Sequence, residues 1–286
     1  LLEAPIQAYY ENIKKRTERI GPLRKIPSEK ELVYYSRSKT WATGSWSESW
    51  SDGAKAWENI AIGNQSHVSS TNPSISLVDY VNDWLFSKNK FNLPYKILRR
   101  EIHANFVQKN TNIDISPVKI EYQNNLSEII ELKLLNIFNT NKSIIVDLNN
   151  VGTGISQLIP ILVSGCMNQL SSIEQPELHL HPKVQCDLSD FFITKINEDK
   201  RHFILETHSE YIALRLLRRI SETHSSELLP ESLKITPYQL AFYYFDYDGE
   251  ETIVSRQEVT EDGDFLLDWP KGFFSEKENE LFYETR

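Results

Sequence analysis

The second half of the chain alternates short apolar runs with stretches in which apolar residues recur at helical spacing. One apolar run ends at Glu174, and a second, Phe203–Leu205, ends just before Glu206. Runs of this length between turn signals predict strands. Periodicity and capping residues predict helices over Ile155–Met167, from Pro182 onward, and from Ser209 to Ile220. Strands that alternate with helices in this order predict an α/β fold with parallel strands.

Two regions flank this predicted core. In the first 150 residues the pattern predicts a helix over Ala4–Arg19, an irregular loop over Trp41–Trp57, a short helix over Val78–Phe86, strands within Ile102–Leu135, and a strand over Ile144–Val146. Near the end, Leu240–Tyr247 and Thr252–Val259 flank Asp248-Gly249 and predict a β-hairpin. We therefore expect a lateral or inserted α+β region (1–150), a core (151–229) and a C-terminal extension (230–286).

Composition narrows the class of protein. Of 286 residues, 40% are hydrophobic and 25% are charged, and no apolar run reaches the roughly 18 residues of a spanning helix. Two cysteines make no disulfide framework, so we expect a cytoplasmic protein without membrane attachment. The net charge of −9 argues against a chain that wraps nucleic acid. A solvated helix face, and not a nucleic-acid contact, is the favoured explanation for Arg215, Arg218 and Arg219.

Reactive side chains gather where the predicted strands end. Glu174 ends one strand, the turn after it carries Glu177, His179 and His181, and His208 follows the next strand. Because the carboxyl ends of neighbouring parallel strands meet at one edge of a sheet, we expect these side chains to face a common ligand. A carboxylate can hold Mg²⁺ and an imidazole can donate to a phosphate. This edge therefore fits hydrolysis of a magnesium nucleotide.

A glycine-bearing loop, Val151–Gln157, opens the first predicted helix of the core. Gly152 and Gly154 leave backbone N–H groups free to approach a phosphate, and the helix adds its positive N-terminal end. A glycine turn between strand and helix is the ordinary alternative. The P-loop motif G-x-x-x-x-G-K-[ST] does not occur in residues 1–286, which begin at Leu1. We therefore expect a longer parent polypeptide with a P-loop upstream.

Three motifs together resemble one family of nucleotide-hydrolysing enzymes. The runs Ile173–Pro182, Glu206–Ser209 and Val151–Gln157 are similar to the Walker B, switch and signature elements of SMC-like, ABC-type AAA ATPases. This group includes the overcoming-lysogenization-defect ATPases and the PtuA ATPases of Septu and retron anti-phage systems. Ile20–Arg24 and Trp269–Phe274 match one bacterial subgroup. The resemblance implies a partial ABC-type ATPase head with a lateral α+β insertion and a C-terminal β-hairpin extension, and ATP and Mg²⁺ as cofactors.

The resemblance also implies a role for each motif residue. Glu174 matches the Walker B acid that holds Mg²⁺, and His208 matches the switch His. Gln175 stands where many relatives have the catalytic Glu, and Glu177 is the nearest spare carboxylate. His181 falls in the loop that contacts a partner subunit. Nucleotide binding is implied for the residues in or beside the signature, namely Gly152, Thr153, Gly154, Ser156 and Gln157.

The resemblance further implies partners. In such ATPases the signature of one subunit completes the nucleotide site of another, which implies a homodimer or a higher homo-oligomer. Nucleotide-dependent dimerisation would then gate a complex with a partner nuclease. The group's roles imply action on DNA or RNA in anti-phage defence or in repair.

Two other functions remain open. Gln175 can orient water but cannot accept its proton, which favours a slow or inactive nucleotide-gated scaffold. Between slow hydrolysis and Glu177 as a replacement base, we favour slow hydrolysis. The second alternative is a zinc-dependent metallohydrolase, since His179, His181 and His208 with Glu177 supply ligands suited to zinc. The H-x-H turn fits a subunit contact equally well.

Overall fold

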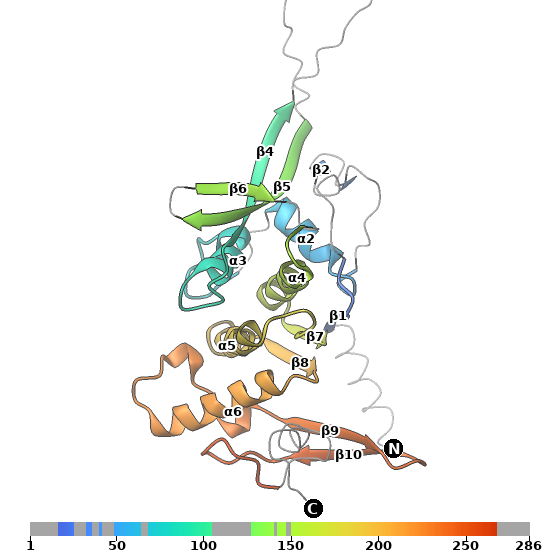
Figure 1. The fold of residues 1–286 in the computed structure, drawn as a ribbon, viewed down its shortest axis with the longest axis vertical. Coiled ribbons are helices and arrows are strands. Elements are labelled where there is room, and N and C mark those ends of the chain that lie inside the picture. Colours follow the sequence, from blue (N-terminus) through green and yellow to red (C-terminus); the bar gives the residue numbers. More distant parts are fainter. Residues whose placement is uncertain are drawn as a thin grey trace, which may run out of the picture. The chain divides into compact units, whose positions relative to one another are not determined.

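In a computed structural model the chain divides into two compact units. The parallel-sheet unit comprises Leu1–Pro22, Ser69–Thr71 and Asn168–Arg286, and the antiparallel-sheet unit comprises Leu23–Val68 and Asn72–Met167. The structure describes residues 17–25, 33–35, 40–41, 49–63, 68–104, 127–139, 142–146 and 150–267 (Figure 1). No helix in these ranges has both the length and the hydropathy needed to cross a bilayer. The domain boundaries at 150 and 229 stay a prediction.

The parallel-sheet unit is built on three strands in the order β1-β7-β8. They are β1 (Thr17–Ile20), β7 (Leu170–Glu174) and β8 (His202–Glu206). Both pairings are parallel, with Ile20 opposite Ile173 and Glu174 opposite Glu206. Helix α5 (Pro182–Asp199) connects β7 to β8, and α6 (Glu210–Ser225) follows β8. This order confirms the predicted α/β fold, and it brings Glu174 and Glu206 to the same edge of the sheet.

The two helices begin where the sequence predicts. Pro182 is the first residue of α5, and Ser209 caps α6 by accepting a hydrogen bond from the Ile212 N–H at 3.1 Å. Helices α5 and α6 lie side by side (Figure 1). Their shared core consists of Ile193, Ile212, Leu216, Ile220 and Ile235. Full burial of an aliphatic side chain contributes about 1.5–3 kcal/mol, so this cluster fixes α6 against α5.

A C-terminal hairpin packs on the same cluster. Strands β9 (Phe242–Tyr247) and β10 (Thr252–Gln257) pair in antiparallel register, which confirms the predicted hairpin. Gly249 in its turn has a φ of 103°, which favours glycine. Leu240, Phe242 and Val259 are partly buried against the cluster. Two short 3-10 helices, η3 (Glu231–Leu233) and η4 (Pro237–Gln239), precede the hairpin. The matched run Trp269–Phe274 lies outside the described residues.

In the antiparallel-sheet unit, the described residues form a β-sheet and the helices α2, α3 and α4. Its strands follow the order β3-β2-β5-β4, with β6 also paired to β5. Ile130, Leu132 and Leu134, within the predicted strand region Ile102–Leu135, are each at most 3% exposed and alternate along β5. The helices are α2, α3 and α4, at Ala54–Ile62, Leu77–Phe86 and Thr153–Met167. The strands are β2 (Val33–Tyr35), β3 (Thr40–Trp41), β4 (Tyr95–Ala104), β5 (Ser127–Asn139) and β6 (Lys142–Val146).

Two predicted elements are wrong. The predicted helix Ala4–Arg19 overlaps the described residues at Thr17–Arg19, which belong to strand β1, and its remainder lies outside them. The predicted loop Trp41–Trp57 is wrong at Trp41, which ends strand β3, and at its last four residues, which begin α2 and include Trp57 at 1% exposed; residues 42–48 lie outside the described residues. Long-range packing explains both differences. Thr17–Ile20 gains a partner strand in β7, and Trp57 is buried in the core as part of α2.

Candidate functional site

The carboxyl edge of β7 and β8 carries two acids and an arginine. Glu174 and Glu206 are register partners at the ends of their strands. Arg19 of β1 grips both oxygens of Glu174: its Nη2 donates to Oε2 at 3.0 Å, and its Nε donates to Oε1. This hydrogen bond and the guanidinium charge hold the pKa of Glu174 below its ordinary value, against the opposing effect of burial. Glu174 is therefore ionised at neutral pH, as a Mg²⁺ ligand must be.

Gln175 turns the chain sharply at the end of β7. Its φ is 44°, in the left-handed region, and its N–H donates to the Glu206 carbonyl at 2.8 Å. That bond extends the β7–β8 pairing by one residue while the backbone changes direction. The buried Pro176 follows. Gln175 therefore lies beside both strand-end acids.

Glu177 is engaged with the loop that follows β8. Its Oε2 accepts a hydrogen bond from the Thr207 hydroxyl at 2.6 Å, and its Oε1 accepts one from the His208 N–H at 2.9 Å. Both carboxylate oxygens thus accept hydrogen bonds from consecutive residues of the neighbouring strand's end. The sequence predicted that the turn after β7 and the residues after β8 share an edge, and these two bonds join them directly.

A second set of hydrogen bonds joins the same loops further from the strands. The Ser209 hydroxyl donates to Gln185 Oε1 at 2.5 Å, and Gln185 Nε2 donates to the Leu180 carbonyl at 2.8 Å. The cap of α6 is thereby tied to the turn that precedes α5. The backbone on both sides of the edge is held by side chains as well as by strand pairing.

The histidines of this edge differ in what they do locally. His181 caps α5, its Nδ1 accepting from the Lys183 N–H at 3.3 Å, and the neighbouring His179 has a φ of 62°. Both are exposed, as is His208. Among the described residues no group of three or more His, Cys, Asp or Glu side chains lies close enough to hold a metal ion by itself.

The glycine loop belongs to the antiparallel-sheet unit, whereas the strand edge belongs to the parallel-sheet unit. Helix α4 begins at Thr153, and the position that a Cβ would take on Gly152 has no atom within 4 Å. Ser156 and Gln157 are buried. The Ser156 hydroxyl donates to the Thr153 carbonyl at 2.7 Å, and the Gln157 amide pairs with the backbone of Arg24 at 3.2 and 2.7 Å. Nucleotide contact by these loop residues, Gly154 included, stays a prediction.

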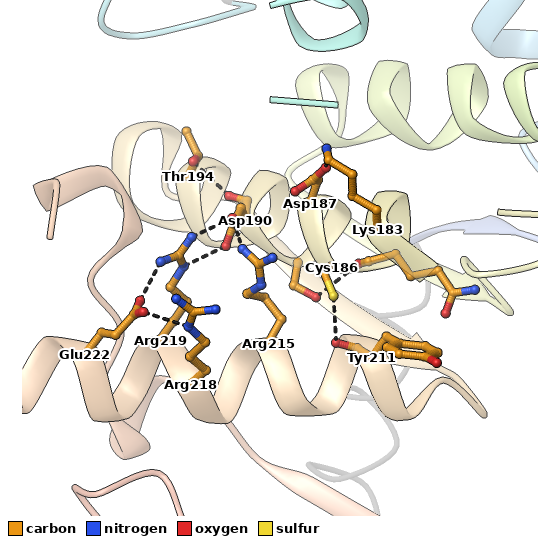
Figure 2. Close-up of polar contacts among 12 residues, drawn as sticks. Lys183, Cys186, Asp187, Asp190, Thr194, Tyr211, Arg215, Arg218, Arg219 and Glu222 are labelled. Atoms are coloured by element: carbon orange, nitrogen blue, oxygen red, sulfur yellow. Dashed lines mark hydrogen bonds and ion pairs between the residues drawn. The ribbon is translucent and has the colours of Figure 1, made fainter. Parts of the chain in front are cut away.

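Arg215 and Arg219 of α6 reach across to α5, and both are paired with acids (Figure 2). Asp190 of α5 accepts from Arg215 at 2.8 Å and from Arg219 at 2.7 and 2.8 Å. The side chains of Arg215 and Arg219 are 18% and 12% exposed, so the predicted solvated face is wrong for these two. Hydrogen bonds to Asp190 raise the pKa of Arg219. Arg218 is 65% exposed and pairs with Glu222 at 2.7 Å.

Three residues of this edge have no role that the sequence pattern predicts. The pattern around Arg19 favours a helix, and only the pairing of β1 with β7 brings Arg19 to Glu174. Glu206 and Thr207 lie in the same motif as His208, but the resemblance implies a role for His208 alone. A signal for Thr207 was present: a hydroxyl that directly follows a strand at the edge shared with Glu177 can bond to that carboxylate.

Comparisons with known proteins place this arrangement in a family. Residues 44–213 match the AAA ATPase domain, and residues 235–283 match a protein family of unknown function, DUF3696. Curated protein sequences give no significant match. Among solved structures, a chain studied for ATP-driven dimerization and DNA-stimulated activation of SMC ATPases is similar at 9% identity and a TM-score of 0.35, covering 63% of this chain and 82% of that one. So distant a similarity carries no inference about activity. Because the AAA ATPase match spans more than half of the 286 residues, this chain belongs to the AAA ATPase domain family.

Proposed function

We propose that this chain supplies the metal-binding and phosphate-sensing part of an ATP-hydrolysing site. The observation that carries the proposal is the strand edge where Glu174, Gln175 and His208 come together through β7, β8 and the hydrogen bonds of Glu177. Membership of the AAA ATPase domain family supports ATP as the nucleotide. Residues 1–286 contain no P-loop motif, and the proposed role is limited to the elements that they do contain.

Each residue of the edge has a proposed task. Glu174 binds Mg²⁺, and on binding one of its oxygens would exchange the hydrogen bond from Arg19 for the ion. Gln175 orients the attacking water, and the exposed His208 donates to the γ-phosphate. Bound Mg²⁺ would neutralise charge that develops on the phosphate oxygens. The residues present fit the ion, because carboxylate oxygens are the ligands that it prefers.

The glycine loop has a proposed task in a second subunit. The N-terminal end of α4 is positively polarised, and the space around Gly152 leaves its backbone open to an approaching phosphate. Ser156 and Gln157 support the loop from inside the antiparallel-sheet unit. We propose that this loop completes the nucleotide site of a partner subunit in a homodimer or higher homo-oligomer, and that the exposed His179 and His181 contribute to that contact.

Slow hydrolysis is the form of the proposal that we favour. Gln175 cannot accept a proton, and a general base contributes about 10²–10⁴-fold to such reactions. Glu177 is the nearest alternative base, yet both of its oxygens accept hydrogen bonds from Thr207 and His208. A nucleotide-gated switch with a long-lived ATP state fits this arrangement better than a fast enzyme does.

The biological setting is proposed from sequence resemblance. The motifs resemble those of overcoming-lysogenization-defect and PtuA ATPases, from which we propose a cytoplasmic complex with a partner nuclease that acts on DNA or RNA in anti-phage defence. The core at 151–229, flanked by 1–150 and 230–286, is proposed as its partial ATPase head.

Steady-state ATPase measurements on the full-length protein test the phosphate-sensing role. His208→Ala should lower kcat at least about tenfold, because a donor to the transferring phosphate is lost. His202→Ala is a matched control, since His202 is exposed at the opposite end of the same strand. Equal turnover in both variants would remove His208 from the site.

A further inference from the structure

Glu177 forms a bridge between the turn after β7 and the residues after β8. Its two carboxylate oxygens receive hydrogen bonds from the Thr207 hydroxyl at 2.6 Å and from the His208 N–H at 2.9 Å. Hydrogen bonds to an ionised carboxylate are shorter and stronger than those between neutral groups, and these distances fall in the charge-assisted range. We refer to this pair of bonds as the Glu177 clasp.

The direction of the Thr207 hydroxyl proton is determined by its neighbours. The Ser209 N–H donates to the same Thr207 oxygen at 3.0 Å, so that oxygen acts as the acceptor toward Ser209. A hydroxyl has one proton, and Glu177 as a carboxylate can only accept. The Thr207 proton therefore points at Glu177. The Thr207 hydroxyl thus links the Glu177 carboxylate to the Ser209 backbone at the start of α6. His208 lies between Thr207 and Ser209.

A backbone hydrogen bond next to the clasp also joins the end of β7 to the end of β8. The Gln175 N–H donates to the Glu206 carbonyl at 2.8 Å, two residues before Glu177 along the chain and one residue before Thr207. The buried Pro176 separates the two connections and limits the freedom of the turn. The backbone that carries Gln175 and the backbone that carries His208 are thus held to each other at two successive points.

We infer that Glu177 is a positioning residue that sets the place of His208 relative to Gln175. The inference rests on the proposed function, in which Gln175 orients the attacking water and His208 meets the γ-phosphate. The Glu177 clasp keeps these two groups at one spacing, so that a shift of the turn after β7 carries His208 with it. Glu177 acts through Thr207 and the His208 backbone, and it takes no proton from water.

Removal of either half of the clasp tests this inference in the full-length protein. Thr207→Val keeps the side-chain shape and removes the hydroxyl that donates a hydrogen bond to Glu177. Glu177→Gln replaces one carboxylate oxygen by an amide N–H₂ and removes the negative charge, so both hydrogen bonds can no longer be accepted as they are in the wild type. Each variant should lower kcat about tenfold to 100-fold and leave the KM for ATP within about twofold, because a displaced group near the reacting atoms costs rate. The double variant should be no slower than the slower single variant.

Thr207→Ser supplies the rescue. Serine keeps the hydroxyl that donates to Glu177 and accepts from Ser209, so Thr207→Ser should turn over near the wild-type rate. If Glu177 were instead the general base, Glu177→Gln would collapse turnover while Thr207→Val stayed near wild type. That pattern would overturn the inference, as would wild-type kcat in both variants.

A measurement without turnover separates this inference from the proposed function. Hydrogen exchange at the His208 amide should speed up in Glu177→Leu, which has no acceptor oxygen, and stay slow in Thr207→Ser. Unchanged exchange in Glu177→Leu would overturn the clasp itself. Full ATPase activity in Glu174→Gln would instead overturn the proposed function, whatever the exchange at His208.

Discussion

At the scale of single residues, the conformation of Gln175 is the least ordinary feature of the strand edge. A left-handed φ of 44° costs a non-glycine residue about 1–2 kcal/mol. The hydrogen bond from its N–H to the Glu206 carbonyl offsets part of this cost. Strained residues collect at functional sites, where surrounding structure holds them in place. The turn therefore keeps a neutral amide beside the acid proposed to bind Mg²⁺.

Gln175→Glu tests whether that amide sets the rate. The two side chains have nearly the same size and backbone preference, so the fold should be unchanged. We expect ATP turnover to rise, by as much as about 10²-fold, because a carboxylate can accept the proton of the attacking water. The measurement is steady-state ATPase with melting temperatures alongside. No gain in Gln175→Glu, together with a collapse in Glu177→Gln and normal turnover in Thr207→Val, would make Glu177 the base.

At the scale of helices and strands, what the sequence predicts depends on how local the signal is. The helices after Pro182 and Ser209 and the hairpin around Gly249 follow from caps and turn residues, and the structure confirms them. Strand β1 does not, because four residues become a strand only through pairing with β7. The partners of Glu177 and Glu174 depend on the same long-range pairing. The sequence could place these acids at an edge but could not name Thr207 or Arg19 as their partners.

Helix α5 ends in an ion pair whose burial makes a stability prediction possible. The side chains of Lys195 and Asp199 are 0% and 4% exposed, and their Nζ and Oδ2 atoms are 2.5 Å apart. Asp199 Oδ1 also accepts from the Ser70 N–H at 2.6 Å, which anchors the Ser69–Thr71 segment. Asp199→Asn should lower the free energy of unfolding by about 3 kcal/mol, because Lys195 keeps a buried charge without its counterion. Denaturant titration measures this.

A second ion pair of α5 supplies the matched control for Asp199→Asn. Lys183 and Asp187 have the same i, i+4 spacing, but Lys183 is 57% exposed, so Asp187→Asn should lower the free energy of unfolding by under about 1 kcal/mol.

Burial raises the pKa of Asp199, but hydrogen bonds from Lys195 and Ser70 outweigh it and hold the pKa below 3.8. The stabilisation is thus complete above pH 3.8 and is lost as pH falls through the lower folded-state pKa. Equal losses of unfolding free energy in Asp199→Asn and Asp187→Asn at neutral pH would contradict the role given to burial.

At the scale of the whole molecule, the two compact units carry different halves of the proposed nucleotide site. The strand edge lies in the parallel-sheet unit and the glycine loop in the antiparallel-sheet unit. If two subunits assemble around ATP, the strand edge of one subunit could meet the glycine loop of the other. The exposed His179, with its left-handed φ of 62°, lies on the turn that we place at the subunit contact.

Light scattering on the full-length protein tests the proposed assembly. ATP with Mg²⁺ should raise the mass toward a dimer, and His179→Asn should weaken that shift, since asparagine tolerates the left-handed backbone but lacks the imidazole. Elemental analysis of the same samples should find no stoichiometric zinc. Stoichiometric zinc that is lost from a His179→Ala, His181→Ala double variant would favour the metallohydrolase instead.

The most direct test of the account is steady-state ATPase of Glu174→Gln in the full-length protein, with Glu251→Gln in the exposed hairpin turn as the matched control. Loss of the carboxylate that binds Mg²⁺ should lower turnover at least about 100-fold, with the melting temperature nearly unchanged, because the side chain keeps its size. Glu251→Gln should retain wild-type turnover. Wild-type turnover in Glu174→Gln would contradict the assignment of the β7–β8 edge as the ATP-hydrolysing site.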